Sequence, residues 1–294
     1  MTKIINKQLL APGIKRLDVL AEAIASQVQP GQFVMVASDE RSERVPLAVV
    51  DSDSRKGTIS LIFPEDSPSL VRLGALPINE SLFYVLGPLG IPAKIEKVGT
   101  VVCIATGMEV APILPMCRAF KKAGNKVVGI IGAKTKKSLV LEAQMRLSCN
   151  KLLVTTNDGS YIRKGLATDA LKEVLNQEDV NLVYAIGSAE MMQSVAKMTK
   201  EKGIKILVRV NPTMVDGTGQ CGSCRVKVAG QTVLACVDGP EFDGHLVDYQ
   251  DLSIRMKAVK EFKEWDSPRS IPNPKNDGSG TLTKFLSGIL KSKP

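Results

Sequence analysis

The sequence predicts an antiparallel β-barrel, a doubly wound α/β domain and a C-terminal cysteine-rich loop. Two changes along its 294 residues support this division. Residues 1–97 contain short apolar runs separated by turn residues, which is typical of small antiparallel barrels. Residues 98–210 instead alternate continuous apolar runs with amphipathic segments, which is typical of a parallel sheet between helices. Residues 211–265 hold three of the six cysteines, and we expect residues 266–294 to form a linker and a tail.

Six predicted strands make up the barrel. They cover residues 3–10, 14–20, 32–37, 45–50, 58–63 and 81–86. One other stretch, Ser67–Leu76, has the spacing of a short helix, and Ser67 or Ser69 would cap its N-terminus. The barrel is therefore expected to carry a helix between its fifth and sixth strands.

The second domain has five predicted strands and four predicted helices. The strands cover residues 100–106, 126–133, 151–156, 181–187 and 204–210, and the helices cover residues 109–124, 138–147, 166–175 and 188–203. Ligands of a doubly wound sheet bind beyond the carboxyl ends of its strands. We therefore expect a binding site where two of these strands end, near Thr106–Gly107 and near Gly187.

The cysteines after residue 210 have the spacing of a metal centre. Cys221 and Cys224 form a C-x2-C pair at a glycine-rich turn, and Cys236 follows two short apolar runs that predict a hairpin. Asp216 lies five residues before Cys221, where plant-type [2Fe–2S] proteins have their first cysteine. A carboxylate can also bind iron, so D-x4-C-x2-C-x11-C supplies four ligands. Positive φ angles are expected at the glycines of this loop, which are Gly217, Gly219 and Gly222.

Other interpretations of these thiols stay open. Zinc could occupy the site, with His245 as an alternative fourth ligand, or the segment could be a plain glycine turn with buried thiols. A disulfide is disfavoured because the start MTKIINKQLL does not resemble a secretory leader, which predicts a reducing cytoplasmic location. The other cysteines, Cys103, Cys117 and Cys149, lie in apolar runs and are expected to be buried, inert thiols.

Composition narrows the function classes. Hydrophobic residues make up 44% and charged residues 23%, as in ordinary globular proteins. No run of eighteen apolar residues occurs, so we expect no membrane span. The net charge of +9 suits an acidic partner or bound dinucleotides, but no basic run interleaved with aromatic residues suggests nucleic-acid binding.

The cysteine-rich segment resembles a known family. VDGTGQCGSC and ACVDGPEFDGHLVD are similar to the small subunit of NADH-dependent ferredoxin:NADP oxidoreductases, also known as sulfide dehydrogenase small subunits. More distantly they resemble the electron-transfer subunit of dihydroorotate dehydrogenase. The resemblance covers about residues 1–265 and implies a ferredoxin-reductase-like fold that binds FAD, NAD(H) or NADP(H), and a [2Fe–2S] cluster. The implied cluster ligands are Asp216, Cys221, Cys224 and Cys236.

The same resemblance implies a flavin site in the barrel. ERVPLAVVD is similar to the family motif R-x-P-L-[ST], in which Arg44 would contact the FAD pyrophosphate through its planar guanidinium. Pro46 and Leu47 would pack on the flavin, and Ala48 stands where the family usually has Ser or Thr near the flavin N5. The turn formed by Gly87, Pro88, Leu89 and Gly90 would lie beside the flavin at the barrel exit.

The implied nicotinamide site is less regular. Thr106, Gly107 and Gly187 match two turns of the family, and the loop of Asp158, Gly159 and Ser160 matches its adenosine-binding loop. Family glycines are replaced by Ala105, Glu109 and Ile162, which add bulk or charge where a dinucleotide approaches.

These observations predict an electron-transfer protein. Hydride would pass between a nicotinamide and FAD, and single electrons between FAD and the cluster. The expected partner is a larger flavin and iron–sulfur subunit, with ferredoxin as a further candidate. The alternative is a relay or scaffold subunit that keeps the cluster but has lost nicotinamide binding. After a basic amphipathic helix that ends at Trp265, residues 282–290 have a short apolar face, which predicts either docking on the partner or a frayed terminus.

Overall fold

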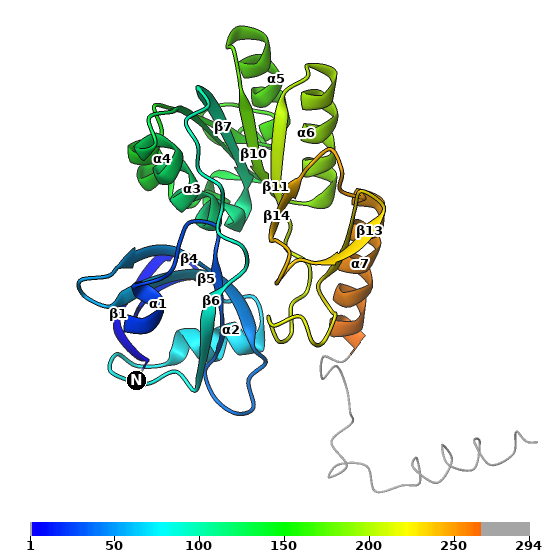
Figure 1. Ribbon diagram of the computed structural model, residues 1–294. Helices are drawn as coiled ribbons and strands as arrows, with labels where there is room; N and C mark the ends of the chain where they lie inside the picture. Colours follow the sequence, from blue (N-terminus) through cyan, green and yellow to red (C-terminus); the bar gives the residue numbers. More distant parts are fainter. Residues whose placement is uncertain (1, 266–294) are drawn as a thin grey trace, which may run out of the picture. The chain divides into compact units, whose positions relative to one another are not determined.

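The computed structural model describes residues 2–265, and the predicted linker and tail after Trp265 lie outside them. The described chain contains two larger sheets and a hairpin (Figure 1). Residues 1–256 form one unit, and residues 257–294 are assigned to a second. Among the described residues, no helix is long and apolar enough to cross a membrane.

The first sheet is antiparallel throughout, with the strand order β1-β2-β5-β4-β3-β6. Its strands are β1 (Lys3–Ala11), β2 (Ile14–Leu20), β3 (Phe33–Ala37), β4 (Val45–Asp53), β5 (Thr58–Pro64) and β6 (Tyr84–Leu89). An isolated bridge between Lys3 and Ser81 brings the two ends of this order together. Alternate side chains such as Leu17, Val19 and Phe63 fill the interior. The predicted barrel is therefore confirmed.

Two short helices accompany the barrel. The sequence did not predict α1 (Glu22–Ala25), a single turn. The predicted helix is α2 (Pro68–Ala75), and the Ser67 hydroxyl caps it by accepting a hydrogen bond from the Leu70 backbone N–H. The sixth strand begins three residues later than predicted, so Gly87, Pro88 and Leu89 belong to β6 rather than to a turn.

The second sheet has the order β14-β11-β10-β7-β8-β9. Its strands are β7 (Thr100–Thr106), β8 (Lys126–Ala133), β9 (Lys151–Thr156), β10 (Leu182–Ile186), β11 (Lys205–Arg209) and β14 (Glu241–Asp243). All neighbours are parallel except β14, which pairs antiparallel with β11 and which the sequence did not predict. The order reverses direction between β7 and β10, which makes the edge beyond Thr106 and Ile186 the switch point of a doubly wound sheet.

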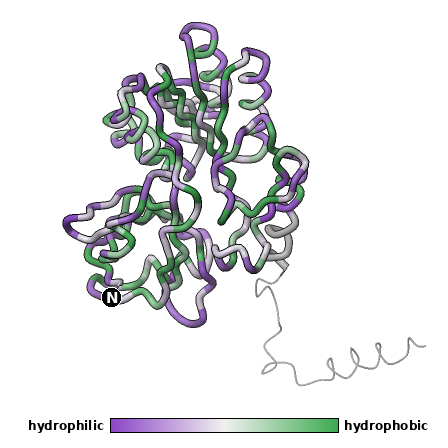
Figure 2. Tube along the Cα trace, in the orientation of Figure 1, coloured by the Kyte–Doolittle hydropathy of each residue, from purple (hydrophilic) through white to green (hydrophobic). Residues whose placement is uncertain are grey.

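Helices cover both faces of this sheet. They are α3 (Val110–Lys122), α4 (Glu142–Ser148), α5 (Ala167–Gln177) and α6 (Ala189–Glu201), with the 3₁₀ turns η1 (Gly107–Glu109) and η2 (Lys136–Ser138). α3 packs with α4 on one face, and α5 packs with α6 on the other. Figure 2 shows that hydrophobic residues follow the sheet strands, while hydrophilic residues gather at the outer loops. α4 starts four residues later than predicted because Leu141 adopts a left-handed φ of 58° before it.

The cysteine-rich segment completes the described unit. It contains the predicted hairpin, β12 (Arg225–Val228) paired with β13 (Gln231–Leu234), then β14 and α7 (Tyr249–Trp265). Cys224, Val226 and Cys236 belong to the same apolar cluster as Phe33 and Met35 of β3. The segment therefore packs directly against the barrel. The three cysteines outside it, Cys103, Cys117 and Cys149, are buried as predicted.

Candidate electron-transfer sites

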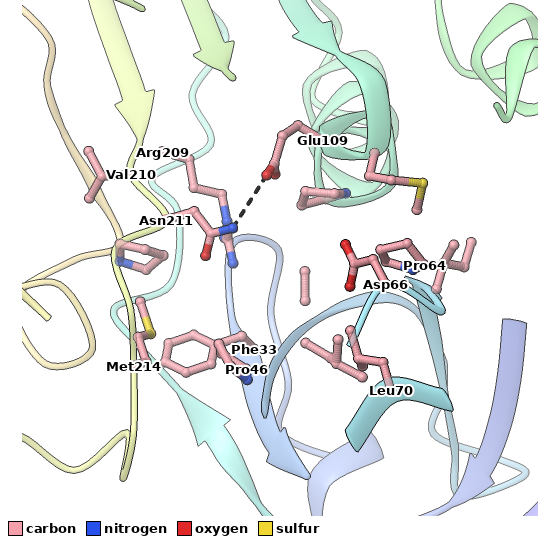
Figure 3. Close-up of a pocket in the computed structure, with 16 residues that line it drawn as sticks. Phe33, Pro46, Pro64, Asp66, Leu70, Glu109, Arg209, Val210, Asn211 and Met214 are labelled. Atoms are coloured by element: carbon pink, nitrogen blue, oxygen red, sulfur yellow. Dashed lines mark hydrogen bonds between the residues drawn. The ribbon is translucent and has the colours of Figure 1, made fainter. Parts of the chain in front are cut away.

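A cavity of about 290 Å³ lies where the barrel, the second sheet and the cysteine-rich segment meet (Figure 3). Pro46, Leu47 and Ala48 of β4 form part of its wall, as expected for residues that would contact a flavin. Met108 and Glu109 of η1 form another part. The lining is mostly apolar with a few polar groups, which is the usual character of a cofactor site.

Arg44 lies immediately before β4, and its side chain is exposed. Its guanidinium carbon lies 4.2 Å from the centre of the Tyr84 ring, within the range of a cation–π contact. Arg44 does not itself line the cavity, although Pro46 two residues later does. Sequence reasoning missed Tyr84, and its only signal was an aromatic residue three positions before Gly87 on the same strand.

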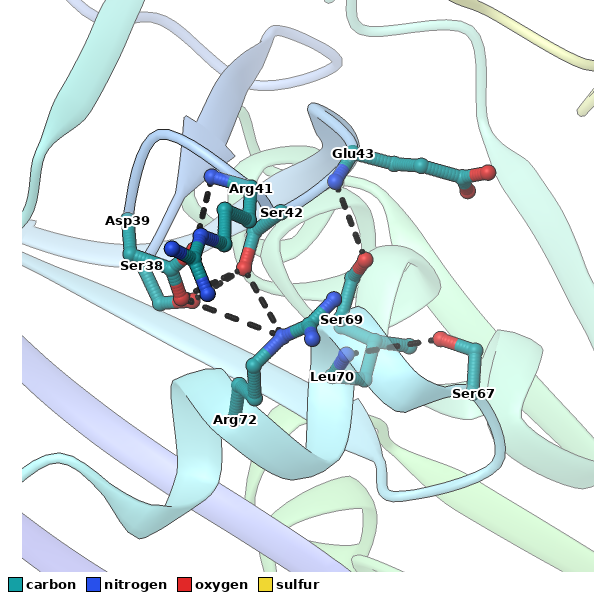
Figure 4. Close-up of polar contacts among 9 residues, drawn as sticks. All are labelled: Ser38, Asp39, Arg41, Ser42, Glu43, Ser67, Ser69, Leu70 and Arg72. Atoms are coloured by element: carbon teal, nitrogen blue, oxygen red, sulfur yellow. Dashed lines mark hydrogen bonds and ion pairs between the residues drawn. The ribbon is translucent and has the colours of Figure 1, made fainter. Parts of the chain in front are cut away.

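The loop that leads into Arg44 is tied to α2 (Figure 4). The Ser42 hydroxyl donates to Asp39 at 2.8 Å and accepts from the Arg72 guanidinium at 3.1 Å. The Glu43 backbone N–H donates to the Ser69 hydroxyl at 3.1 Å. The hydrogen bond from Ser42 is the main reason that the pKa of Asp39 is lowered. The contact with Ser69 holds the chain before Arg44 against the first turn of α2, and a helix N-terminus is a favourable place for an anionic group.

The residues Gly87–Gly90 connect the cavity wall to the cysteine-rich segment. Gly90 has a φ of 79°, and a Cβ there would lie 2.9 Å from Pro240 and 3.1 Å from Phe33. Both of these neighbours line the cavity. Leu89 would lie 2.8 Å from a Cβ added at Gly217 in the cysteine loop. Glycine is therefore needed at Gly90 because the cavity wall, β6 and the cysteine-rich segment approach closely there.

Glu109 points toward the cavity rather than toward the carboxyl ends of the central strands. Its carboxylate accepts a hydrogen bond from the Asn211 side chain at 3.3 Å (Figure 3). Burial raises the pKa of Glu109, and the hydrogen bond from Asn211 and the charge of Arg209 oppose part of that rise. The sequence left open whether this carboxylate would repel a dinucleotide or turn away from it, and in the structure it is hydrogen-bonded to Asn211 at the cavity wall.

A buried ionic network lies behind Asn211. Arg209 is 8% exposed, donates to the Gly31 carbonyl oxygen and lies 3.6 Å from Glu241. The Tyr184 hydroxyl donates to Glu241 at 2.5 Å. Burial raises the pKa of Glu241 and of Tyr184. The network joins the barrel, the second sheet and β14, and sequence reasoning missed it because no local pattern marks it.

A separate groove of about 560 Å³ lies at the carboxyl ends of the central strands. Thr106 and Gly107 line it, as predicted from the sheet topology, together with Gly132 after β8 and Ser188 after β10. A Cβ added at Gly107 would meet nothing within 4 Å, so a ligand can approach the backbone there. At Gly187, a Cβ would lie 2.2 Å from the Met191 methyl carbon, the flexible end of that side chain, and 3.0 Å from the Thr106 hydroxyl oxygen, so the backbone packs closely beside the groove there.

The predicted adenosine loop follows Asn157, which lines the groove. The Asp158 carboxylate accepts hydrogen bonds from the Ser160 N–H and hydroxyl at 2.9 and 2.7 Å. Gly159 has a φ of 77°, and Ile162 has a φ of 47°. Asp158, Gly159 and Ser160 adjoin the groove without lining it. The isoleucine thus adopts the left-handed conformation that the family's glycine would adopt easily.

The cysteine loop has the backbone that was predicted for it. Gly217, Gly219 and Gly222 have φ angles of 79°, 90° and 64°. The Asp216 carboxylate accepts hydrogen bonds from the backbone N–H groups of Thr218 and Cys221, each at 2.7 Å. The N–H of Thr218 is the main reason that the pKa of Asp216 is lowered.

The four predicted metal ligands lie in two pairs. Cys224 donates to Cys236 at 3.3 Å between sulfurs, both buried, while Cys221 is exposed and its N–H contacts Asp216. Burial and the neighbouring Cys224 raise the pKa of Cys236 to about 12, so this thiol is protonated until a metal displaces the proton.

Across residues 2–265, no three Cys, His, Asp or Glu side chains converge as a metal-binding group. His245 contacts Thr199 at 3.0 Å instead. The donor types and the glycine-rich backbone fit an iron–sulfur cluster. Convergence of all four ligands stays a prediction.

Comparisons with known proteins support this interpretation. Residues 211–248 match the iron–sulfur cluster binding domain of dihydroorotate dehydrogenase B. The chain is 34% identical to the dihydroorotate dehydrogenase B (NAD(+)) electron transfer subunit homolog of Thermotoga maritima, over 89% of this chain and 92% of that one. It is also 39% identical to an uncharacterised protein in the adh 3′ region of Clostridium beijerinckii, over 90% and 92% of the two chains.

Solved structures agree with the sequence comparisons. The structure of an NADH-dependent reduced ferredoxin–NADP oxidoreductase, described for flavin-based electron bifurcation, has a TM-score of 0.84 and 34% identity over 90% of this chain and 96% of its own. Phthalate dioxygenase reductase, with a TM-score of 0.56 and 14% identity over 77% of this chain and 85% of its own, shares the fold. These findings confirm the ferredoxin-reductase-like fold and the predicted resemblance. The chain therefore belongs to the family of dihydroorotate dehydrogenase B electron transfer subunits and is an electron-transfer subunit of the oxidoreductase type.

Proposed function

We propose that this subunit passes electrons between NADH or NADPH, FAD and a [2Fe–2S] cluster, and from the cluster to a larger flavin and iron–sulfur subunit. This is the chemistry of the ferredoxin:NADP oxidoreductase type, with ferredoxin as a candidate acceptor or donor of the complex. In this proposal, residues 1–97 hold FAD, residues 98–210 hold the nicotinamide, residues 211–265 hold the cluster, and residues 266–294 serve as a linker and tail.

One observation carries the proposal: the cavity adjoins both other candidate sites along the chain. Gly107 lines the groove, and the next two residues line the cavity. Met214 lines the cavity, and Asp216 begins the cysteine loop two residues later. Electron transfer requires such neighbouring sites, and the protein's task is to set their spacing and electrostatics.

The residues near the cavity suit a flavin dinucleotide. Pro46, Leu47 and Ala48 offer a largely apolar wall for the ring system. Arg44 has its guanidinium on the ring of Tyr84 and is exposed, so it is accessible to a pyrophosphate. An arginine fork binds phosphate oxygens in two places at once, which supports this assignment.

The nicotinamide cofactor would bind in the groove, with Thr106, Gly107 and Gly187 near its nicotinamide half. Asp158, Gly159 and Ser160 would lie at its adenosine half. Because Glu109 lines the cavity and not the groove, Glu109→Gly should leave NADH affinity within about twofold of the wild type, which corresponds to less than about 0.5 kcal/mol.

The direct test uses the anaerobically purified full chain together with its co-purifying subunit. We expect FAD and about two irons and two sulfides per chain, and rapid bleaching of the flavin absorbance on mixing with NADH or NADPH. Cys221→Ala should lose the cluster, whereas the matched control Cys149→Ala removes a buried thiol outside the loop and should keep it. Zinc in place of iron, or a full cluster in Cys221→Ala, would overturn the cluster assignment.

Arg44 provides the test of the flavin assignment. Arg44→Ala should weaken FAD binding by about 1.5–3 kcal/mol, because a charge-assisted contact to phosphate is lost. Arg55→Ala removes another exposed arginine, on the β4–β5 hairpin, and should have no effect. Equal FAD retention in both variants would refute the role of Arg44.

A second candidate function is a relay or scaffold subunit without nicotinamide binding. Ile162 favours it, because a β-branched residue holds a left-handed φ of 47° where the family has glycine. Binding of NADH and NADPH to the wild-type complex, measured by flavin reduction and calorimetry, distinguishes the two functions. Micromolar affinity supports the full relay, whereas no binding in a complex that still holds FAD and iron supports the scaffold.

A further inference from the structure

Glu109 is a titratable group at the wall of the candidate flavin cavity. It lines the cavity together with Ala48 of β4. Asn211, which follows β11, lies beside it (Figure 3). The Glu109 carboxylate accepts the Asn211 hydrogen bond at 3.3 Å. Glu109 is half-buried and Asn211 is exposed, so this hydrogen bond links a carboxyl group at the cavity wall to a solvent-exposed side chain.

The charges around Glu109 leave it able to take up a proton. Arg209 is the nearby cation, but it already lies 3.6 Å from Glu241 and donates to the Gly31 carbonyl oxygen. Its attraction for the Glu109 carboxylate is therefore shared with another carboxylate. Asp66 is the other carboxylate at the cavity and lies at its exposed rim. Burial accordingly raises the pKa of Glu109 despite Asn211 and Arg209.

The electron-transfer reaction proposed above releases a proton at the flavin site, and a carboxylate there could accept it. Oxidation of a nicotinamide by hydride transfer delivers two electrons and one proton to the flavin site, whereas electrons pass to an iron–sulfur cluster one at a time and without a proton. One proton per nicotinamide oxidised is therefore left at the cavity when both electrons have gone to the cluster. A carboxylate within reach of the cavity and of solvent can accept that proton and release it.

We propose that the Glu109 carboxylate accepts this proton from the flavin site and releases it to solvent beside Asn211, and that it supplies the proton when electrons flow in the opposite direction. This inference rests on the proposed function, because it requires flavin in the cavity. Asn211 is a positioning residue: its hydrogen bond favours the charged form of Glu109 and orients the carboxylate.

The test measures the pH dependence of the flavin midpoint potential in the full-length complex by spectroelectrochemistry between pH 5 and pH 9. Protonation of the reduced flavin itself produces one break in the plot of potential against pH, and a protein group coupled to flavin reduction adds another. We expect the additional break in the wild type, its loss in Glu109→Gln and its retention in Glu109→Asp. Asn211→Ala should move the break to higher pH, since the hydrogen bond that favours the carboxylate is gone. Asp66→Asn, the matched control at the same cavity, should leave the break in place.

A second measurement does not depend on flavin redox chemistry. In flavin-free protein, ¹³C NMR of labelled glutamate carboxyl carbons should show that Glu109, like Glu241, has a pKa above the ordinary glutamate range, and its signal is identified by its absence in Glu109→Gln. A wild-type complex without flavin would refute the proposed function itself. If flavin is bound but the wild type and Glu109→Gln have the same pH profile, only the role of Glu109 is overturned. If Glu109→Gln fails to fold, an unchanged break in Asn211→Ala overturns that role instead.

Discussion

Two loops of this protein use the same turn in different surroundings. Asp158-Gly159-Ser160 and Asp216-Gly217-Thr218 each have an aspartate that accepts the N–H two residues later, at 2.9 and 2.7 Å. The glycines have nearly equal φ angles of 77° and 79°. An added Cβ would lie 3.0 Å from the exposed Lys164 side chain at Gly159, but 2.6 Å from the fully buried Met35 and 2.8 Å from the half-buried Leu89 at Gly217.

The difference shows that packing, and not the turn itself, sets how much substitution each loop tolerates. Local chemistry explains both turns equally well, because aspartate and glycine favour this conformation wherever they occur. Only the loop at Gly217 is pressed onto the barrel, next to β3 and β6. We therefore expect the cysteine loop to be rigid in its position and the adenosine loop to be adaptable.

The largest expected effect comes from adding a methyl group to each glycine. Gly217→Ala should reduce the free energy of unfolding by about 2–5 kcal/mol, since it combines left-handed strain with a clash at 2.6 Å from Met35. Gly159→Ala should cost only about 1–2 kcal/mol, because its nearest contacts are at 3.0 Å or more, on the exposed Lys164 side chain, and are far less close than those at Gly217. Urea unfolding of the two full-length variants measures both values, and equal losses would remove the distinction between the loops.

A double-mutant cycle separates the clash with Met35 from the backbone strain in Gly217→Ala. Met35→Ala should relieve the clash in Gly217→Ala, so the double variant should be more stable than the sum of the single changes by about 1–2 kcal/mol. The same cycle between Met35 and Gly159 pairs residues without a shared contact and should show no coupling beyond about 0.5 kcal/mol. Absence of coupling at Gly217 would mean that strain alone accounts for its loss.

A substitution at Ile162 should stabilise the protein, in contrast to those at the two glycines. Ile162→Gly should raise the free energy of unfolding by about 1 kcal/mol, because glycine adopts a φ of 47° without strain. Ala229→Gly, at a φ of 50° in the β12–β13 hairpin, should raise it less because alanine has no branched side chain. Thermal and urea unfolding of both variants would reveal this order, and a destabilised Ile162→Gly would show that the side chain has a contact worth more than the strain.

The smallest expected effect is a change in acid sensitivity at the adenosine loop. Hydrogen bonds from Ser160 lower the pKa of Asp158 below its usual 3.8. A lowered pKa in the folded state adds stability above the unfolded value, and that stability is lost as the pH falls through the folded value. Asp158→Asn and Ser160→Ala should therefore lose stability less steeply between pH 5 and pH 3 than the wild type does. Parallel unfolding curves across that range would contradict this role.

Much of the fold could be predicted from the sequence because its elements carry strong local patterns. The barrel strands are short apolar runs between turn residues, the central strands of the second sheet are continuously apolar, and Ser67 marks a helix start. β14 could not be predicted, since three residues carry no periodicity and their pairing depends on β11, far away in the chain. α1 is a single turn and is equally hard to recognise.

The site divides in the same way. The cysteine spacing and its glycines are local, and their backbone was predicted correctly. Tyr84 under Arg44 and the network of Arg209 and Glu241 depend on residues that meet only after folding. Glu109 is the clearest case, because its partner Asn211 is 102 residues away and determines which site the carboxylate faces.

The short strand β14 also affects the tendency of the protein to aggregate. An edge strand with unpaired N–H and C=O groups can pair with the edge strand of another molecule, and such pairing leads to aggregation. β14 covers Leu207, Val208 and Arg209 of β11, so the cysteine-rich segment shields an apolar edge. A fragment of residues 98–210 would leave that edge bare. We therefore expect the cysteine-rich segment to protect the second sheet from self-association, independently of its role in electron transfer.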